Sequence, residues 1–387
     1  MTESKPVVLI YRSQLLRPSE TFIQSQATSM QTFRPFFVGR SRVRGIELAK
    51  DSFWVANRGG RAGRLQELRF RILGPSAECQ KIIRGLNPKI VHGQFGPDAC
   101  EALPLASIFC VPLIVTFHGF DATLTDSAHG ETRQGRRFLR GRGALKREAA
   151  RFTAVSKFIA KKLADQGFPQ DKIQVHYIGV DTNRFQPDPT IERQNIVLFV
   201  GRLVEVKGCE YVIRAMEQVQ REMPSIELVI IGDGPLREVL EKQAASSLRR
   251  FRFLGAQPSE TIRSWMSRAT VLCTPSTVAA SGAAEGFGIV FIEAQASGLP
   301  VVSFSSGGIP EAVSHGVSGY LAPDKDWRAL AEGIAKLFRD QAMWSSFSLA
   351  GRELVKRGFD LTVQTGKLER IYEETIRNYQ RRERAQA

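Results

Sequence analysis

Short apolar runs alternate with helix-like stretches along almost the whole of this 387-residue chain, and few folds accommodate that alternation. Runs such as Val7–Ile10 and Ile196–Val200 are apolar at every position, as strands are when both faces of a parallel sheet are covered. Strands and helices that succeed one another in this way indicate the α/β class. In the first half, strands are expected at Val7–Tyr11, Phe36–Val38, Ile90–His92, Leu113–Thr116, Arg151–Val155 and Gln174–Tyr177.

The alternation starts afresh after a proline-punctuated segment, Pro187-Asp-Pro189-Thr190, which we take as the domain boundary. The chain is long enough for two domains that each bury a core. We therefore expect two doubly wound, Rossmann-like domains, residues 1–187 and 188–365, that face each other across a ligand-binding cleft. In the second half, strands are expected at Ile196–Val200, Glu227–Ile231, Phe251–Leu254, Val271–Thr274 and Val301–Phe304.

Two carboxylates stand eight positions apart in the stretch Glu285-Gly-Phe-Gly-Ile-Val-Phe-Ile-Glu293. Phe287–Gly298 has the pattern of a helix, and a helix N-terminus carries unpaired N–H donors that suit an anion such as a diphosphate. Glu285 then lies before the anion site, and Glu293 lies about two turns along the helix, within reach of a hydroxyl pair. The pattern favours a nucleotide-sugar held end to end, although taken alone it is equally that of a solvated helix face.

A second motif, Gly201-Arg202-Leu-Val-Glu-Val-Lys207-Gly208, follows the apolar run Ile196–Val200. Arg202 and Lys207 therefore lie on the loop after the carboxyl end of a strand, where ligands of open α/β sheets bind. The planar fork of Arg and the point charge of Lys suit the oxygens of a diphosphate leaving group. The alternative is a basic surface loop.

With these two motifs, the chain resembles the retaining glycosyltransferases of family 4, which have the GT-B fold, over most of its length. The stretch Pro18-Ser-Glu-Thr-Phe22 is similar to one in bacterial transferases of the exopolysaccharide and colanic acid type. The resemblance implies that a terminal helix, residues 366–387, crosses back to the first domain. Other matching segments are Val115-Thr-Phe-His118-Gly119-Phe-Asp121, Ala154-Val-Ser156-Lys157-Phe, Gly179-Val-Asp181, Ile231-Gly232-Asp233-Gly234-Pro235-Leu236, Gly307-Gly308-Ile-Pro-Glu311 and Gly316-Val-Ser-Gly319-Tyr-Leu.

The resemblance implies a role for each candidate residue in hexosyl transfer from a nucleotide-sugar. Arg202 and Lys207 stabilise the departing diphosphate, and Glu285 orients the transferred sugar. His118 touches that sugar and supports positive charge through its carbonyl or its ring, while Asp121 helps to position the acceptor. The remaining donor contacts are Glu293 at the ribose, backbone at Leu254 for the base, and the chain at Gly286, Phe287, Gly288 and Ile289 for the phosphates.

The acceptor side departs from the family, many members of which carry a Gly-Gly loop after the first strand. Tyr11-Arg-Ser-Gln-Leu-Leu-Arg-Pro-Ser19 stands there without glycine. Arg12, Arg17 or Ser19 can contact an anionic acceptor such as a lipid diphosphate, although structural packing explains them equally well. His92, which ends a strand, is a further acceptor candidate.

No metal or other cofactor is expected, because cations and a helix dipole can neutralise the diphosphate. Asp324-Lys-Asp326 has the Asp-x-Asp form of a metal-binding motif, but its place before the Trp327 helix favours an N-cap. The five cysteines are odd in number and lack metal-ligand spacing, which fits a reduced cytoplasm. No signal peptide or transmembrane helix is expected, because the chain leads straight into a strand and its longest uncharged stretch is broken by proline.

The positive charge is concentrated in the first half of the chain. Of a net +15, residues 1–188 contribute +13, from 29 Lys and Arg against 16 Asp and Glu. The excess gathers in Arg34–Arg71 and Arg133–Arg151, and the second segment has the apolar spacing of an amphipathic helix that can lie on an anionic membrane. A solvated face is the alternative. Nucleic acid is not expected, since no recognition motif accompanies the charge.

Together these features favour a retaining, cytoplasmic glycosyltransferase that extends a lipid-linked or polysaccharide-precursor acceptor at the inner face of the plasma membrane. The alternative within the same fold is a soluble enzyme that acts on a small acceptor, such as a sugar phosphate or a natural product. A nicotinamide-dependent oxidoreductase is disfavoured, because Gly-x-Gly-x-x-Gly is absent after Ile10 and Gly232-Asp-Gly234 is followed by Arg237 where that motif needs glycine.

Overall fold

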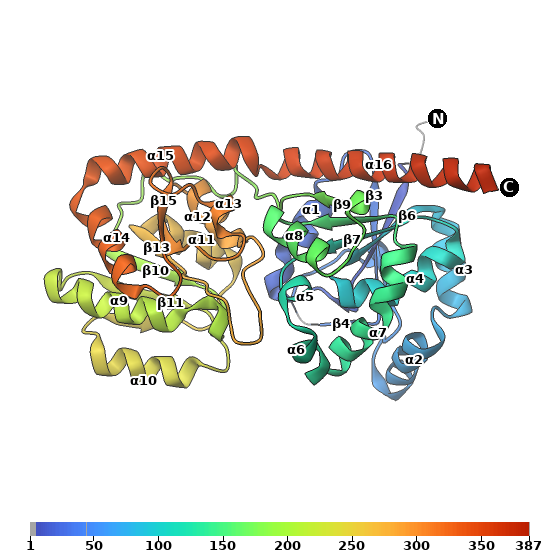
Figure 1. Cartoon of the computed structure of the whole chain (residues 1–387), viewed down its shortest axis with the longest axis horizontal. Helices are drawn as coiled ribbons and strands as arrows, with labels where there is room; N and C mark the ends of the chain where they lie inside the picture. The colour runs from blue at the N-terminus through green and yellow to red at the C-terminus, as the bar shows by residue number, and fades with distance from the viewer. Residues whose placement is uncertain (1–4, 44, 387) are drawn as a thin grey trace. The chain divides into compact units, whose positions relative to one another are not determined.

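The computed structural model describes residues 5–43 and 45–386, which form two compact units. The first unit runs to Gly179 and takes in the chain again from Leu361, and the second unit comprises Val180–Asp360 (Figure 1). The divisions fall at 179/180 and 360/361, whereas the sequence suggests 187/188 and 365/366. Each unit is built on one large parallel sheet, as the alternation of strands and helices predicts.

The large sheet of the first unit has the strand order β5-β3-β1-β6-β7-β8-β9. Its central strand β1, Val7–Tyr11, is buried at every position. Val8 and Ile10 point into a core on one face, and their neighbours along the strand are buried on the other, so the run contains no charged residue. The remaining strands are β3 (Arg34–Gly39), β5 (Phe53–Val55), β6 (Pro88–Gln94), β7 (Leu113–Phe117), β8 (Arg151–Ala154) and β9 (Ile173–Val175), with a separate short pair of β2 (Gln14–Leu15) and β4 (Ser41–Arg42).

Along the chain, the helices of the first unit connect these strands, apart from one helix that comes from the end of the chain (Figure 1). All six strands expected in this half form. The helix Gly60–Leu73 is not predicted, because its Leu and Ile residues face solvent and leave no core periodicity to read. The helices are α1 (Thr21–Thr28), α2 (Gly60–Leu73), α3 (Ala77–Leu86), α4 (Gly96–Phe109), α5 (Phe120–Thr123), α6 (Asp126–Glu131), α7 (Arg133–Glu148), α8 (Lys157–Asp165) and α16 (Leu361–Gln386).

Helix α16 joins the first unit, as the resemblance implies for the terminal helix. Its buried face, which includes Leu368 and Tyr372, belongs to the same core as Val8 and Ile10 of β1. The Glu369 carboxylate accepts hydrogen bonds from the N–H groups of Thr32 and Phe33, at 2.7 and 3.0 Å. The helix is therefore held by apolar burial and by an acidic side chain that satisfies two buried or partly buried backbone donors.

The second unit has the strand order β12-β11-β10-β13-β14-β15. Its core surrounds β10, where Val197 and Phe199 are fully buried. The strands are β10 (Ile196–Val200), β11 (Glu227–Ile231), β12 (Phe251–Phe253), β13 (Val271–Cys273), β14 (Val301–Phe304) and β15 (Gly319–Ala322), and the helices are α9 (Cys209–Glu222), α10 (Arg237–Ser247), α11 (Ser259–Arg268), α12 (Ile289–Ala296), α13 (Ile309–Ala312), α14 (Trp327–Arg339) and α15 (Gln341–Gly358).

Helix α7 forms where the basic segment predicts a helix, but its apolar face is not available to a bilayer. Phe138 and Leu145 are fully buried, so this face packs into the unit. Gly135 permits the approach, since a Cβ there would meet the His129 carbonyl oxygen at 2.0 Å. The expectation that this helix lays its apolar residues on a membrane is therefore wrong. Within the described residues, no helix is both long enough and apolar enough to cross a membrane.

A buried chain of hydrogen bonds links α16 to three strands of the first unit. Tyr372 Oη lies 2.6 Å from His92 Nδ1, and His92 Nε2 lies 2.6 Å from Thr116 Oγ1. Thr116 Oγ1 lies 2.6 Å from Thr153 Oγ1, which donates to the Val115 carbonyl at 3.3 Å. Because a carbonyl only accepts, every hydroxyl must donate in the same direction, and His92 Nδ1 accepts from Tyr372. Burial lowers the pKa of His92 to about 3, consistent with a neutral ring.

Replacement of Tyr372 by Phe should lower the free energy of unfolding by about 1–3 kcal/mol, because the buried His92 Nδ1 then keeps only a long 3.5 Å contact with Gln94 Nε2. Urea unfolding measures the loss. Tyr379→Phe is the matched control on the same helix, since Tyr379 is only half-buried, and it should change stability by less than about 0.5 kcal/mol. Equal stability of Tyr372→Phe and the unmodified chain would contradict this account of how α16 docks.

Candidate functional site

In the second unit, two loops follow the neighbouring strands β10 and β13. The order of strands in the sheet reverses direction between these two strands. In chain order, the strands from β12 to β15 read 3-2-1-4-5-6, so the connections from β10 and β13 run to opposite sides. Ligands of open α/β sheets bind outside the carboxyl ends of strands at this switch point. The segments that follow β10 and β13 carry both predicted donor motifs, Gly201–Gly208 and Glu285–Glu293.

The structure brings Lys207 and Glu285 together at this switch point, although they are 78 positions apart in the chain. Lys207 Nζ forms an ion pair with Glu285 Oε2, and both side chains remain partly exposed. Ser276 Oγ donates to the same carboxylate oxygen at 3.3 Å. Sequence reasoning missed Ser276, whose only signal is its place two residues after the expected strand Val271–Thr274.

Glycine allows neighbouring backbone to close around this pair. Gly208 has φ +63°, and a Cβ there would meet the Pro275 carbonyl oxygen at 2.0 Å. A Cβ at Gly307 would meet the Glu285 carbonyl oxygen at 2.3 Å, and the N–H of Gly308 donates to that oxygen at 2.9 Å. The Gly307-Gly308 segment therefore holds the backbone of Glu285 in place.

Helix α12 starts two residues later and ends two residues earlier than the predicted Phe287–Gly298. Gly288 is its N-cap, so Ile289 supplies the first helical N–H group at the end that faces an anion. Glu293 lies in the second turn and is half-buried. Burial raises the pKa of Glu293 to about 7, and the positive charge of Arg184 opposes that rise.

Two further donor candidates lie in the same unit without joining the Lys207–Glu285 pair. Arg202 is exposed, and it forms no ion pair within the part of the chain that the structure describes. Leu254 is half-buried, and its N–H donates to the Ile230 carbonyl at 2.9 Å. Arg202 is therefore a cation free to meet a ligand.

A second ion pair occupies the corresponding switch point of the first unit, between β1 and β6. Arg12 is only 4% exposed; its guanidinium pairs with Glu20 at 2.8 Å and with Asp98, and lies 4.5 Å above the Phe95 ring. The Ser13 N–H also donates to Asp98, at 2.8 Å. Arg12 was predicted to contact the acceptor, but carboxylates inside the protein neutralise its charge. Asp98 was missed, and its signal is an acid in the first turn after Gly96-Pro97.

His118 lies on the loop that follows β7, where Asp121 fixes the backbone. The Asp121 carboxylate accepts from the N–H groups of Gly96, His118 and Gly119 at 2.9–3.0 Å, and burial raises its pKa to about 6. His118 Nε2 lies 2.7 Å from Gln94 Oε1, while its Nδ1 is buried with no hydrogen-bond partner within the described residues. Burial holds the pKa of His118 well below its ordinary value, so the ring is neutral.

The remaining acceptor candidates differ in their access to a ligand. Ser19 is exposed in a short helical turn, Pro18–Glu20. His92 is 1% exposed and both of its ring nitrogens are engaged in the buried chain described above. A direct contact between His92 and an acceptor requires that chain to open. Gln94, which shares a strand face with His92, was not predicted.

The Asp-x-Asp segment caps a helix, as predicted. Asp326 accepts hydrogen bonds from the N–H groups of Arg328 and Ala329, both at 3.1 Å, at the start of α14. Among the residues that the structure describes, no group of three or more His, Cys, Asp and Glu is placed to hold a metal ion. Metal independence stays a prediction.

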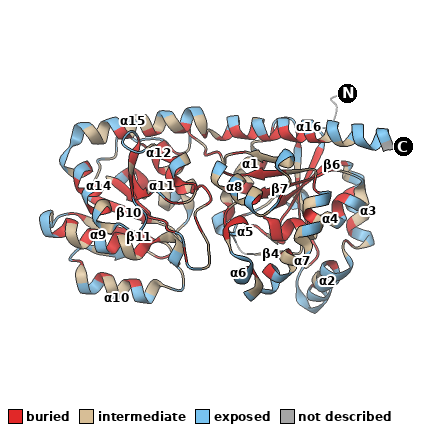
Figure 2. Cartoon of the chain, viewed as in Figure 1, coloured by how far each residue is buried: buried red, intermediate tan, exposed pale blue. Residues whose placement is uncertain are grey.

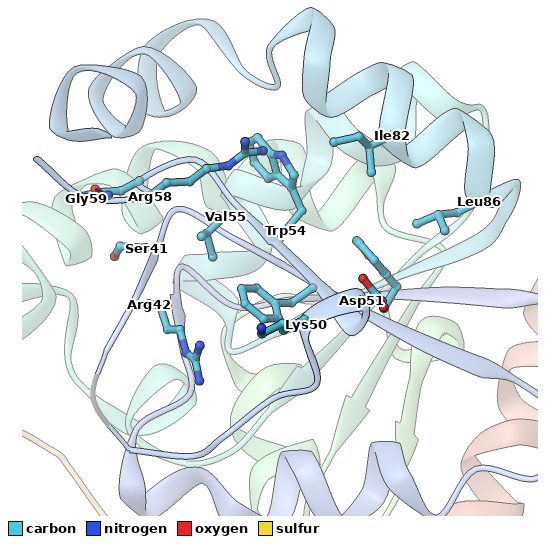
Figure 3. Close-up of a pocket in the computed structure, with 13 residues that line it drawn as sticks. Ser41, Arg42, Lys50, Asp51, Trp54, Val55, Arg58, Gly59, Ile82 and Leu86 are labelled. Carbon is cyan, nitrogen blue, oxygen red and sulfur yellow. Dashed lines mark hydrogen bonds between the residues drawn. The ribbon is translucent and has the colours of Figure 1, made fainter. Parts of the chain in front are cut away.

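A pocket of about 850 Å³ opens at the sheet edge of the first unit, along β5 (Figure 3). Arg42, Lys50 and Arg58 give it a positive rim, and Trp54 forms part of its wall. None of the predicted site residues lines it. The predicted donor residues at the switch point therefore lie outside this pocket.

Comparison with known proteins agrees with this geometry. The family model "Glycosyl transferases group 1" matches residues 181–354, and "Glycosyltransferase Family 4" matches residues 36–184. WcaL of Salmonella typhimurium, named for colanic acid biosynthesis, is 30% identical over 298 residues, which are 74% of this chain and 70% of WcaL. The chain belongs to glycosyltransferase family 4. The amylovoran biosynthesis glycosyltransferase AmsK of Erwinia amylovora is 33% identical over 57% of this chain and 55% of its own length.

Solved structures confirm the expected GT-B fold of this chain. Alr3699/HepE from Anabaena, in complex with UDP and glucose, has a TM-score of 0.75 over 95% of this chain and 100% of its own, at 19% identity. Sucrose-phosphate synthase from Thermosynechococcus elongatus has a TM-score of 0.74 over 96% and 99%, at 20% identity. In contrast, the match to the curated relatives is partial, with 64% of WcaL of Escherichia coli and 55% of AmsK covered.

The raised pKa of Glu293 predicts a pH dependence of stability that Glu293→Gln should remove. Between the ordinary value of 4.5 and about 7, the folded chain binds the proton more tightly than the unfolded chain. This contribution to stability is therefore full below about pH 4.5 and is lost as the pH rises through about 7. Urea unfolding of both proteins at about pH 5 and about pH 8 should show the unmodified chain losing stability relative to Glu293→Gln. The buried Asp121 cancels in that difference, and parallel pH profiles would contradict the assignment.

Proposed function

We propose that this glycosyltransferase is a retaining hexosyltransferase that moves a sugar from a nucleotide-sugar to a lipid-linked or polysaccharide-precursor acceptor in the synthesis of a bacterial surface polysaccharide. The observation that carries the proposal is the Lys207–Glu285 ion pair, which lies at the switch point of the second unit. A cation that a ligand can share and a carboxylate beside it match the two ends of a sugar diphosphate.

In this proposal the diphosphate of the donor replaces Glu285 as the ion-pair partner of Lys207. Lys207 and the exposed Arg202 receive phosphate oxygens, together with N–H groups near Gly286, Phe287, Gly288 and Ile289. Glu285, released from Lys207, accepts hydrogen bonds from the hydroxyls of the transferred sugar. Glu293 holds the ribose hydroxyls in its ionised form, and backbone at Leu254 contacts the base.

Transfer proceeds on one face of the sugar. The bond between the anomeric carbon and the diphosphate oxygen breaks, the acceptor oxygen bonds to the same face of that carbon, and the acceptor's proton passes to the departing phosphate. Lys207 and Arg202 offset the charge that develops on the leaving group. This route needs no enzyme nucleophile, so trapping of a glycosyl-enzyme adduct would contradict it.

The acceptor side is assigned to the first unit. The neutral ring of His118 has its Nδ1 buried, which favours the His118 carbonyl over the ring as the group that supports positive charge on the sugar. Asp121 positions the acceptor indirectly, by holding the N–H groups of His118 and Gly119. Ser19 is exposed and contacts the acceptor, whereas Arg12 and His92 act from within the fold.

A lipid-linked acceptor is favoured over a small soluble one by two observations. A relative from Mycolicibacterium smegmatis, 33% identical over 54% of this chain and 59% of its own length, is named GDP-mannose-dependent alpha-(1-6)-phosphatidylinositol monomannoside mannosyltransferase. The first half of this chain also carries most of the positive charge, which attracts anionic lipid. We therefore place the enzyme at the inner face of the plasma membrane.

Removal of individual donor contacts should separate binding from turnover. Lys207→Ala and Glu293→Ala should weaken donor binding, and Glu285→Ala should lower kcat by about 100–1000-fold. Thermal shift and hydrolysis with UDP-, GDP- and ADP-sugars identify the donor first, because a bound ligand stabilises the fold. Lys242→Ala, an exposed residue on α10, is the control. Full activity in all three site variants would sink the donor assignment.

Chelation should leave transfer intact. After treatment with EDTA, the rate with the identified donor should remain within about twofold of the untreated rate, because Lys207 and Arg202 supply the positive charge. A loss of activity that Mg²⁺ or Mn²⁺ restores would overturn the prediction of metal independence.

A further inference from the structure

Arginines crowd one pocket of about 350 Å³ in the first unit, which we name the arginine pocket. Its lining includes six guanidinium groups and one carboxylate, so the formal charge of the lining is strongly positive. Helix α7 contributes four of the arginines at the spacing i, i+3, i+4 and i+7, which places them on one face of the helix. The lining residues are Arg40, Arg71, Glu101, Arg133, Gln134, Arg136, Arg137 and Arg140.

The arginine pocket adjoins the switch point of the first unit. Its Gln134 donates to Asp98 at 2.8 Å, and Asp98 is the partner of Arg12 at the end of β1. Glu101 lies one turn beyond Asp98 on α4. The pocket therefore continues from the sheet edge where ligands of such folds bind.

The protein neutralises only part of this charge. Glu101 is shared between Arg40, at 2.8 Å, and Arg137, at 3.0 Å, and it also accepts from the Tyr11 hydroxyl at 3.0 Å. Arg40 also pairs with Glu67 at 3.3 Å, and its buried Nε–H, which is the group near Glu101, has no well-aligned acceptor among the described residues. Both carboxylate oxygens are thus in use before the remaining arginines are considered.

Three arginines of the pocket have no anionic partner in the described part of the chain. Arg71, Arg133 and Arg140 are exposed, and no hydrogen bond or ion pair holds their guanidinium groups. Like charges gathered in one pocket repel each other, and a bound anion relieves that repulsion. The guanidinium fork matches phosphate oxygens, so the ligand with complementary chemistry is a diphosphate.

Helix α2, which supplies Arg71, is exposed along much of its length (Figure 2), and its exposed residues include an apolar stripe. Leu65, Leu68 and Ile72 follow helical spacing and are 68%, 41% and 67% exposed. Gly63 and Phe70, on the opposite side of the helix, are its buried residues. The stripe is flanked by arginines, which is the pattern of a helix that lies at the surface of an anionic bilayer.

We propose that the arginine pocket binds the diphosphate group of a lipid whose apolar part lies against the Leu65–Leu68–Ile72 stripe of α2. The inference rests on the proposed function only in taking this lipid to be the acceptor. Within that function, the pocket replaces Arg12 as the cation that meets the anionic end of the acceptor.

Binding of inorganic pyrophosphate tests the pocket directly. Arg202→Ala/Lys207→Ala is the background, so that the donor cations do not contribute, and calorimetry measures the affinity. Arg133→Gln/Arg140→Gln should weaken binding by about tenfold or more for each arginine removed. Arg377→Gln/Arg381→Gln, an equal loss of charge from exposed positions of α16, should leave the affinity unchanged. Equal affinities in all of these proteins would overturn the proposal.

Vesicle sedimentation then identifies the source of the diphosphate. The unmodified chain should sediment with phosphatidylcholine vesicles that contain a polyprenyl diphosphate, and less well with vesicles of the same charge made with phosphatidylglycerol. The Leu68→Ser/Ile72→Ser variant should bind pyrophosphate with unchanged affinity but should no longer sediment with the vesicles. Equal sedimentation with both anionic lipids overturns the diphosphate assignment. Pyrophosphate binding without any vesicle binding overturns the lipid assignment.

Hydrolysis of the donor by the unmodified chain distinguishes failure of this proposal from failure of the proposed function. If the donor is hydrolysed but pyrophosphate binding is unchanged in Arg133→Gln/Arg140→Gln, only the proposal for the arginine pocket is wrong. If pyrophosphate binding depends on these arginines but no nucleotide-sugar is hydrolysed, the pocket proposal is supported and the proposed transferase activity is contradicted.

Discussion

The carboxyl edges of two parallel sheets determine where this chain can place charge against a ligand. In both units the strand order reverses at the centre, where the connections from the two central strands run to opposite sides of the sheet. An ion pair joins the segments that follow these strands in each unit, Arg12–Asp98 in the first and Lys207–Glu285 in the second. The pairs are alike in position but differ in how completely they are satisfied.

That difference assigns their roles. Arg12 has two carboxylate partners and an aromatic ring above it, and almost none of it meets solvent. Removing one partner from such a buried group is costly, so the Arg12 pair serves the fold. Lys207 has one carboxylate and stays partly exposed, which suits the proposed exchange of Glu285 for a donor phosphate. In that proposal, stability and ligand binding are separated between two equivalent positions.

Features that depend on a local residue pattern can be predicted from the sequence, whereas features that depend on contacts between distant residues cannot. The runs Val7–Ile10 and Ile196–Val200 predict central strands because burial on both faces removes every polar residue. The motifs around Lys207 and Glu285 likewise predict residues that the fold brings together. The buried state of His92 depends on Tyr372, 280 positions away, and no local pattern announces it. Helix α2 escapes prediction for the opposite reason, because its apolar residues do not face a core.

The orientation of α7 connects the charge of the first half with its surface. Amphipathic spacing shows that one face of this helix is apolar, but it does not say whether that face meets a core or a bilayer. Burial of Phe138 and Leu145 settles the choice and necessarily turns Arg133, Arg137 and Arg140 to the other side. Part of the excess positive charge is thereby gathered on one exposed face, beside the switch point. A fold that gathers cations in this way is stabilised by an anion and destabilised without one, which couples occupancy of the pocket to the stability of the unit.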